Sequence, residues 1–138
     1  MNGKIKYFLL IIGAVLNVYA VSFFINPMLL GEMVGFSAHS PNTYVEITAF
    51  YGGLELGLGL YFIWTSLKPQ RYDSGLMAVF LLFFIAGLSR LFALLYYGFE
   101  NPSQPIVSIV EIGFSLVAIW FKRKIKPDNG NNDYSVIV

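Results

Sequence analysis

Three charged residues stand inside long apolar stretches of the chain and are the first candidates for chemistry. Glu55 lies in "YGGLELGLGLYFIW", which has no polar face, Arg90 lies in "GLSRLFAL" and Glu111 in "VEIG". A charge at the centre of a membrane helix costs about 2.5 to 3.5 kcal/mol or more, so it normally faces the protein interior and pairs. Guanidinium and carboxylate can form two parallel charged hydrogen bonds. We therefore expect Arg90 to pair with Glu111 or with Glu55.

Two glutamates and one arginine leave a surplus carboxyl group. One arginine cannot neutralise two carboxylates, so the second should keep its proton or meet a cation or a polar ligand. A pair of Arg90 with a single glutamate has a purely structural interpretation, in which a buried ion pair fixes the register of two helices. The second glutamate has no such simple explanation, and it favours a binding or catalytic role.

The composition indicates what surrounds these charges. Hydrophobic residues make up 57% of the 138 residues and charged residues 12%, whereas globular domains carry about 25% charged residues. A soluble chain of this length could not bury so much apolar surface. We therefore expect an integral membrane protein with the lipid bilayer as its main partner. The net charge of +1 gives no indication of a nucleic-acid partner.

Four apolar segments are long enough to cross a bilayer, which takes about 20 residues. They are residues 7–25, 44–67, 76–97 and 102–121. The predicted fold class is all-α, an integral membrane four-helix bundle over residues 1–126, followed by a disordered cytoplasmic tail at 127–138. The first segment has an alternative interpretation as a cleaved signal peptide, because Lys4 and Lys6 precede an apolar core and "VYA" resembles a cleavage site.

Basic residues predict the orientation of the bundle. Lysine and arginine precede the first span, separate the second from the third, and follow the fourth. The two other loops, residues 26–43 and 98–101, contain neither. Both termini should therefore lie in the cytoplasm, and the expected location is the cell inner membrane.

A weak internal repeat gives the depth of the glutamates. "ELGLGLYFIW" from Glu55 aligns without gaps with "EIGFSLVAIW" from Glu111, and a lysine follows each tryptophan by four residues. Tryptophan beside lysine is typical of the cytoplasmic interface. Nine residues at 1.5 Å each then put both glutamates about 13 Å above it, near the midplane. A second alignment, "AVLNVYA" with "GLSRLFA", pairs Asn17 with Arg90 and makes Asn17 a candidate for the same pocket. Chance similarity between apolar, glycine-rich helices is the alternative.

Helical spacing predicts on which helix face two other polar residues, Ser108 and Glu46, lie. Ser108 lies three residues before Glu111, on the same helix face, and extends a polar stripe. Glu46 lies nine residues before Glu55, about half an α-helical turn out of phase, so the two should point to opposite faces. We expect Glu46 to be mostly structural, near the outer end of its helix.

The glycines around Glu55 have two expected uses. Gly53 and Gly57 form a small-xxx-small pair that lets another helix approach closely. Gly52 and Gly59 flank Glu55 on its own face, which should leave room beside it for a partner chain or a ligand. Packing is the main role that we expect for all four.

No motif in the chain predicts a cofactor or a metal. The sequence has no nucleophile with a base at a suitable spacing, no glycine-rich phosphate loop and no dinucleotide fingerprint. Cysteine is absent, and the single histidine, His39, has no second ligand nearby.

The stretches "YGGLELGLGLYF", "GLSRLFAL" and "VEIG", within a short four-span chain, resemble the bacterial domain-of-unknown-function family numbered 4345. The resemblance covers about residues 5–122 and implies a small bacterial inner-membrane protein. It singles out the following residues: Tyr51, Gly52, Gly53, Glu55, Gly57, Arg90 and Glu111. The architecture is also distantly similar to the four-span DoxX-like proteins, which implies no function.

The leading functional hypothesis is non-enzymatic. It is a midplane polar pocket of Glu55, Arg90 and Glu111, also lined by Tyr51, that binds a proton, a cation, a polar lipid or a small molecule. Such a protein would act as an accessory subunit or a simple transporter, with a membrane-protein partner or a second copy of itself. One alternative is a membrane enzyme acting on a lipid-soluble substrate, with Glu55 or Glu111 as general acid or base. The other alternative is a structural assembly module.

Overall fold

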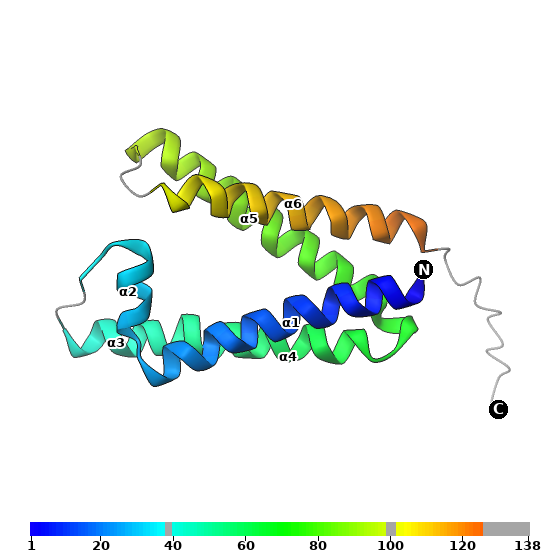
Figure 1. The fold of residues 1–138 in the computed structure, drawn as a ribbon, viewed down its shortest axis with the longest axis horizontal. Helices are drawn as coiled ribbons and strands as arrows, with labels where there is room; N and C mark the ends of the chain where they lie inside the picture. Colours follow the sequence, from blue (N-terminus) through cyan, green and yellow to red (C-terminus); the bar gives the residue numbers. More distant parts are fainter. Residues whose placement is uncertain (38–39, 99–101, 126–138) are drawn as a thin grey trace, which may run out of the picture.

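The computed structural model describes residues 1–37, 40–98 and 102–125, and within these ranges the chain is helical and contains no strand (Figure 1). The helices are α1 (Asn2–Ile25), α2 (Met28–Val34), α3 (Pro41–Ile47), α4 (Glu55–Ser66), α5 (Tyr72–Tyr97) and α6 (Ser103–Lys124). A π-helical segment, Thr48–Leu54, joins α3 to α4, and a 3₁₀ turn, Pro69–Arg71, leads into α5. The predicted tail at 127–138 and the single histidine, His39, lie outside the described residues.

Four helical stretches are long and apolar enough to cross a membrane: α1, the continuous helix Pro41–Ser66, the stretch Pro69–Tyr97 that ends with α5, and α6. The chain is therefore all-α, as predicted, with four long apolar helices.

The segment between the first two long helices, which the sequence predicts to be a loop, contains a short helix. Pro27 is the N-cap residue of α2, where its missing N–H costs nothing. Gly35, with φ 94°, ends α2 in the left-handed conformation that glycine adopts most easily. After the turn, the Ser40 hydroxyl accepts a hydrogen bond from the Thr43 N–H at 3.4 Å, which starts α3.

The long helices associate as two pairs. In Figure 1, α1 lies along α4, and α5 lies along α6, with fewer contacts between the two pairs than within either. Glycines permit the close approach in each pair. A Cβ on Gly13 of α1 would lie 2.6 Å from the Gly59 carbonyl oxygen of α4, and one on Gly87 of α5 would lie 2.8 Å from Ile112 Cγ1 of α6.

The two pairs meet at one end of the molecule and diverge toward the other. A shared apolar core holds them together near the start of α1 and α5, where the fully buried side chains include Ile5, Leu9, Phe62, Leu76 and Val79. Beyond this core, the α5/α6 pair moves away from the α1/α4 pair, toward the end where α2 and α3 lie (Figure 1). The predicted four-helix bundle is thus two helix pairs joined at one end.

Candidate functional site: a cleft between the helix pairs

A cavity of about 560 Å³ lies where the helix pairs diverge. Its lining comes from every helix between α1 and α6 and consists of Leu16, Leu30, Phe36, Thr43, Glu46, Ile47, Phe50, Tyr51, Leu54, Glu55, Leu58, Phe62, Leu82, Phe83, Ala86 and Glu111. Glu55 and Glu111 both face it, from opposite helix pairs. The lining is mainly apolar, so the small polar pocket predicted from the sequence is an apolar cleft with a few polar groups.

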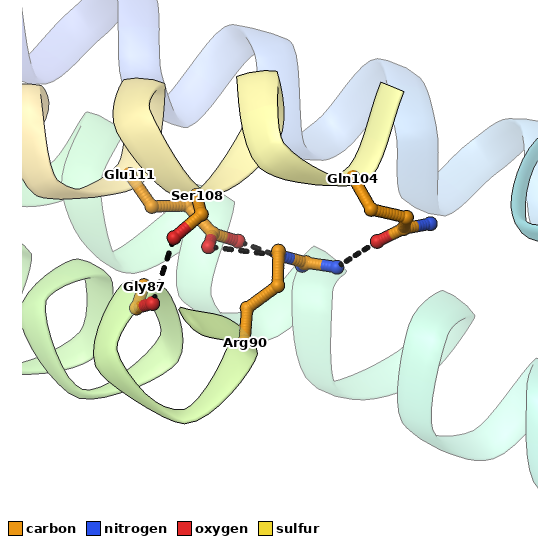
Figure 2. A network of polar contacts seen from close by, with 5 residues as sticks. All are labelled: Gly87, Arg90, Gln104, Ser108 and Glu111. Atoms are coloured by element: carbon orange, nitrogen blue, oxygen red, sulfur yellow. Dashed lines mark hydrogen bonds and ion pairs between the residues drawn. The ribbon is translucent and has the colours of Figure 1, made fainter. Parts of the chain in front are cut away.

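Arg90 and Glu111 form the ion pair of the site (Figure 2). Arg90 Nε donates to Glu111 Oε2 at 3.0 Å, and Nη2 donates to Oε1 at 2.8 Å, which is the two-bond geometry expected for this pair. The third nitrogen, Nη1, donates to Gln104 Oε1 at 2.7 Å. All three guanidinium nitrogens are therefore engaged within the α5/α6 pair, and the structure selects Glu111 over Glu55 as the partner of Arg90.

Gln104 is a member of this network that the sequence analysis did not identify. It lies seven residues before Glu111, which is two turns along the same face of α6. That spacing is a detectable signal, because it places a polar side chain on the stripe that carries Glu111.

Ser108 completes the contact between α5 and α6. Its hydroxyl is buried and donates to the Gly87 carbonyl oxygen at 2.9 Å (Figure 2). The bond joins α5 and α6 at Gly87, where the two helices approach closely. Ser108 was a candidate ligand-binding residue, but this geometry uses its only proton for helix packing.

Glu55, the first residue of α4, is the surplus carboxyl group. It is partly buried and faces the cleft, and it makes no hydrogen bond or ion pair with any residue that the structure describes. Since Arg90 is occupied by Glu111 and Gln104, no described cation balances the Glu55 carboxyl group.

Glu46 also lines the cleft, contrary to the prediction that it points away from Glu55. Nine residues make two and a half turns of α-helix at 3.6 residues per turn, which would place the two side chains on opposite faces. The π-helical segment Thr48–Leu54 lies between them. Its i→i+5 hydrogen bonds take about one more residue per turn, so the nine residues span about two full turns. Both carboxyl groups therefore face the same cavity.

Of two further predicted site residues, Tyr51 and Asn17, one lines the cleft and the other does not. Tyr51 lines the cleft, and its ring meets that of Phe23 edge-on with centroids 6.0 Å apart. Asn17 does not line the cleft. It packs against Gly59 at the α1–α4 contact, and its buried Oδ1 has no hydrogen-bond partner among the described residues.

Of the four glycines around Glu55, two pack against another helix, as we expected for all of them, and two do not. Gly52 packs against the ring of Phe24, and Gly59 packs against α1, so neither leaves open space beside Glu55. A Cβ on Gly57 would meet nothing within 4 Å, and one on Gly53 would meet only Thr48 of its own helical stretch. The Gly53/Gly57 pair therefore contacts no other helix of the described chain.

The comparisons with known proteins give one match. A family model with the description "Domain of unknown function (DUF4345)" matches residues 5–122, which include every residue of the cleft. Searches of curated proteins and of solved structures find no match.

Proposed function

The chain belongs to this family of unknown function, and we propose that it is a multi-pass protein of the bacterial inner membrane whose cleft binds a lipid-soluble ligand. The outward faces of the helices support the membrane location. Large apolar side chains there are strongly exposed, among them Phe92 at 68%, Leu95 at 80% and Ile109 at 70%. Contact with lipid removes the cost of leaving such side chains in water.

Basic and aromatic residues at the joined end of the helix pairs support an orientation with both termini in the cytoplasm. The Arg71 guanidinium lies 3.8 Å from the ring centre of Trp64, and Lys124 Nζ lies 3.9 Å from that of Trp120. Tryptophan and basic residues gather in this way at the cytoplasmic boundary of membrane helices. The cleft then opens toward the opposite side of the membrane.

The observation that carries the binding proposal is the cavity itself. Its volume of about 560 Å³ falls within the range of about 300 to 1,000 Å³ that small-molecule sites occupy. Its walls are apolar except for a few polar groups, which is the usual composition of such sites. The Glu55 carboxyl group, which has no described partner, supplies a group that orients a ligand.

The same position of Glu55 supports a second candidate function, a membrane enzyme. A carboxyl group without a partner, beside a cavity that holds a lipid-soluble molecule, can act as general acid or base. Glu111 does not fit this role, because both of its oxygens accept hydrogen bonds from Arg90. The structural interpretation accounts for Arg90, Glu111 and Ser108, but it does not account for Glu55.

Displacement of a fluorescent fatty alcohol from purified protein in uncharged detergent micelles tests the binding proposal. We expect saturable binding to the wild-type protein and its loss in Ala86→Phe and in Leu58→Phe, because each substitution fills the cavity from a different wall. Val110→Phe is the matched control, since Val110 is 47% exposed and does not line the cavity. Identical, non-saturable uptake of the probe by all four proteins would contradict the proposal.

A further inference from the structure

We propose that the ligand of the cleft is a basic amphiphile, whose protonated amine pairs with Glu55 and whose apolar part lies against the deeper walls. This inference rests on the proposed function, because it concerns the same cavity. It goes further by assigning the charge of the ligand and by giving Glu46 a role in recognition.

The charges that face the cleft are all acidic. Among the residues that the structure describes, its lining contains Glu46, Glu55 and Glu111 and no lysine, arginine or histidine. Arg90 lies beside the cavity, but it directs two of its nitrogens to Glu111 and the third to Gln104. One positive charge therefore balances one of three carboxyl groups. The excess favours a cationic ligand.

The surroundings of Glu55 strengthen this assignment. Leu54, Leu58, Leu82 and Phe83 line the cavity together with it. A carboxylate among apolar side chains carries a large desolvation cost unless it meets a positive charge or hydrogen-bond donors. An ammonium group offers both in one contact. A carboxylate or phosphate headgroup at the same point would instead add repulsion between like charges.

The shape of the cavity gives the orientation of the ligand. Phe62, two turns beyond Glu55 on α4, lies at the joined end of the helix pairs and belongs to the shared apolar core. The wall from Glu55 to Phe62 carries Leu58 and no charge. It extends for about 10 Å at 1.5 Å per residue, which suits an alkyl chain or a ring. In this orientation, the amine of the ligand pairs with the Glu55 carboxyl group, and its apolar part lies along the apolar wall toward Phe62.

Glu46 lies on the other side of Glu55, toward the diverging end of the molecule. At no more than 1.5 Å per residue, the nine residues between the two glutamates span up to about 13 Å, and Glu46 is exposed whereas Glu55 is partly buried. Glu46 therefore contributes to attraction and entry of the cation, and Glu55 holds it. The π-helical segment Thr48–Leu54 is what brings Glu46 to this wall.

The test compares three amphiphiles with the same chain, namely dodecylamine, dodecanol and dodecanoate, as competitors of the fluorescent fatty alcohol at neutral pH. For the wild-type protein, we expect dodecylamine to compete at a concentration about tenfold lower than dodecanol, as one charge-assisted pair implies. Dodecanoate should be the weakest competitor. Because the three partition differently into micelles, the informative quantity is the change in each midpoint between variants.

Three glutamine substitutions test which glutamate causes the preference for dodecylamine over dodecanol. Glu55→Gln should remove the preference for dodecylamine over dodecanol. Glu46→Gln should reduce that preference by a smaller factor. Glu32→Gln, on α2, is the matched control, because Glu32 is exposed and does not line the cavity, and it should leave all three midpoints unchanged.

The outcomes separate this inference from the proposed function. Saturable competition that Ala86→Phe abolishes, with midpoints that Glu55→Gln leaves unchanged for all three amphiphiles, would refute the basic ligand and leave the cleft as a binding site. Tightest competition by dodecanoate would also overturn the inference and would assign recognition to Arg90. Absence of saturable binding by any of them would refute both proposals.

Discussion

Breaking the Arg90–Glu111 pair from one side should destabilise the packing of α5 on α6. Arg90→Ala leaves Glu111, whose side chain is only 14% exposed, without either of its hydrogen bonds at 3.0 and 2.8 Å, and it leaves Gln104 without its bond at 2.7 Å. Removing one partner of a fully buried pair costs about 3 to 5 kcal/mol. The Arg90 side chain is 33% exposed, so the pair is not fully buried, and we expect a smaller loss of about 2 to 3 kcal/mol.

A double-mutant cycle isolates the pair. Glu111→Gln alone removes one charge and weakens the hydrogen bonds, whereas Glu111→Gln combined with Arg90→Ala leaves no uncompensated charge. The double variant should therefore be more stable than the sum of the single changes predicts, by about 1 kcal/mol or more. The free energy of unfolding can be measured by circular dichroism during titration of mild-detergent micelles with dodecyl sulfate.

An exposed ion pair in the same molecule is the control for this cycle. Lys122 pairs with Asp73, whose side chain is 60% exposed, and Lys122→Ala should cost less than about 1 kcal/mol. If Arg90→Ala and Glu111→Gln are additive within about 0.5 kcal/mol, the two side chains do not interact in the folded protein, and the interpretation of the site is wrong.

Three more predictions concern orientation and packing. In this cysteine-free chain, Ser37→Cys should react with an impermeant thiol reagent on intact cells and Gln70→Cys should not; the reverse pattern would invert the proposed topology. Gly59→Ala should lower stability by about 1 to 3 kcal/mol because its new methyl group would overlap a side chain of α1. Gly57→Ala, which meets nothing within 4 Å, should be neutral or stabilising, and equal effects at the two glycines would refute the α1–α4 contact. Ser108→Ala should cost about 1 kcal/mol in unfolding free energy while ligand displacement stays unchanged, whereas lost binding at full stability would make it a ligand contact.

The long helices and the charged pair could be anticipated from elementary physical chemistry. Apolar stretches of sufficient length, bounded by proline or glycine, predict helices that can cross a membrane. The cost of an unpaired charge predicts that Arg90 meets a carboxylate. The choice between Glu55 and Glu111 depends on which helices are neighbours. Periodicity does not contain that information, because α4 and α6 both adjoin α5 in the chain, and it is the tertiary packing that makes α6 its close neighbour.

The position of Glu46 could not be predicted with α-helical spacing. The apolar pattern of Thr48–Leu54 fits either an α-helix or a π-helix. An α-helix would place Glu46 on the face opposite Glu55, whereas a π-helix places both on the same face. The short helix α2 is a different case. Pro27 and Gly35 flank it in the order typical of a helix start and a helix end, so the sequence did contain its signals.

Photochemical labelling of the cleft tests the central claim most directly. Dodecylamine with a diazirine in its chain, irradiated with the purified protein and mapped by peptide mass spectrometry, should label the cavity walls, chiefly Leu54 of the π-helical segment, Leu58 of α4 and Leu82 of α5. Ala86→Phe should remove this labelling, and an excess of unlabelled dodecylamine should compete with it. Labelling spread over outward-facing residues of α5 and α6, unchanged by Ala86→Phe and by the competitor, would show that the cleft is not a binding site.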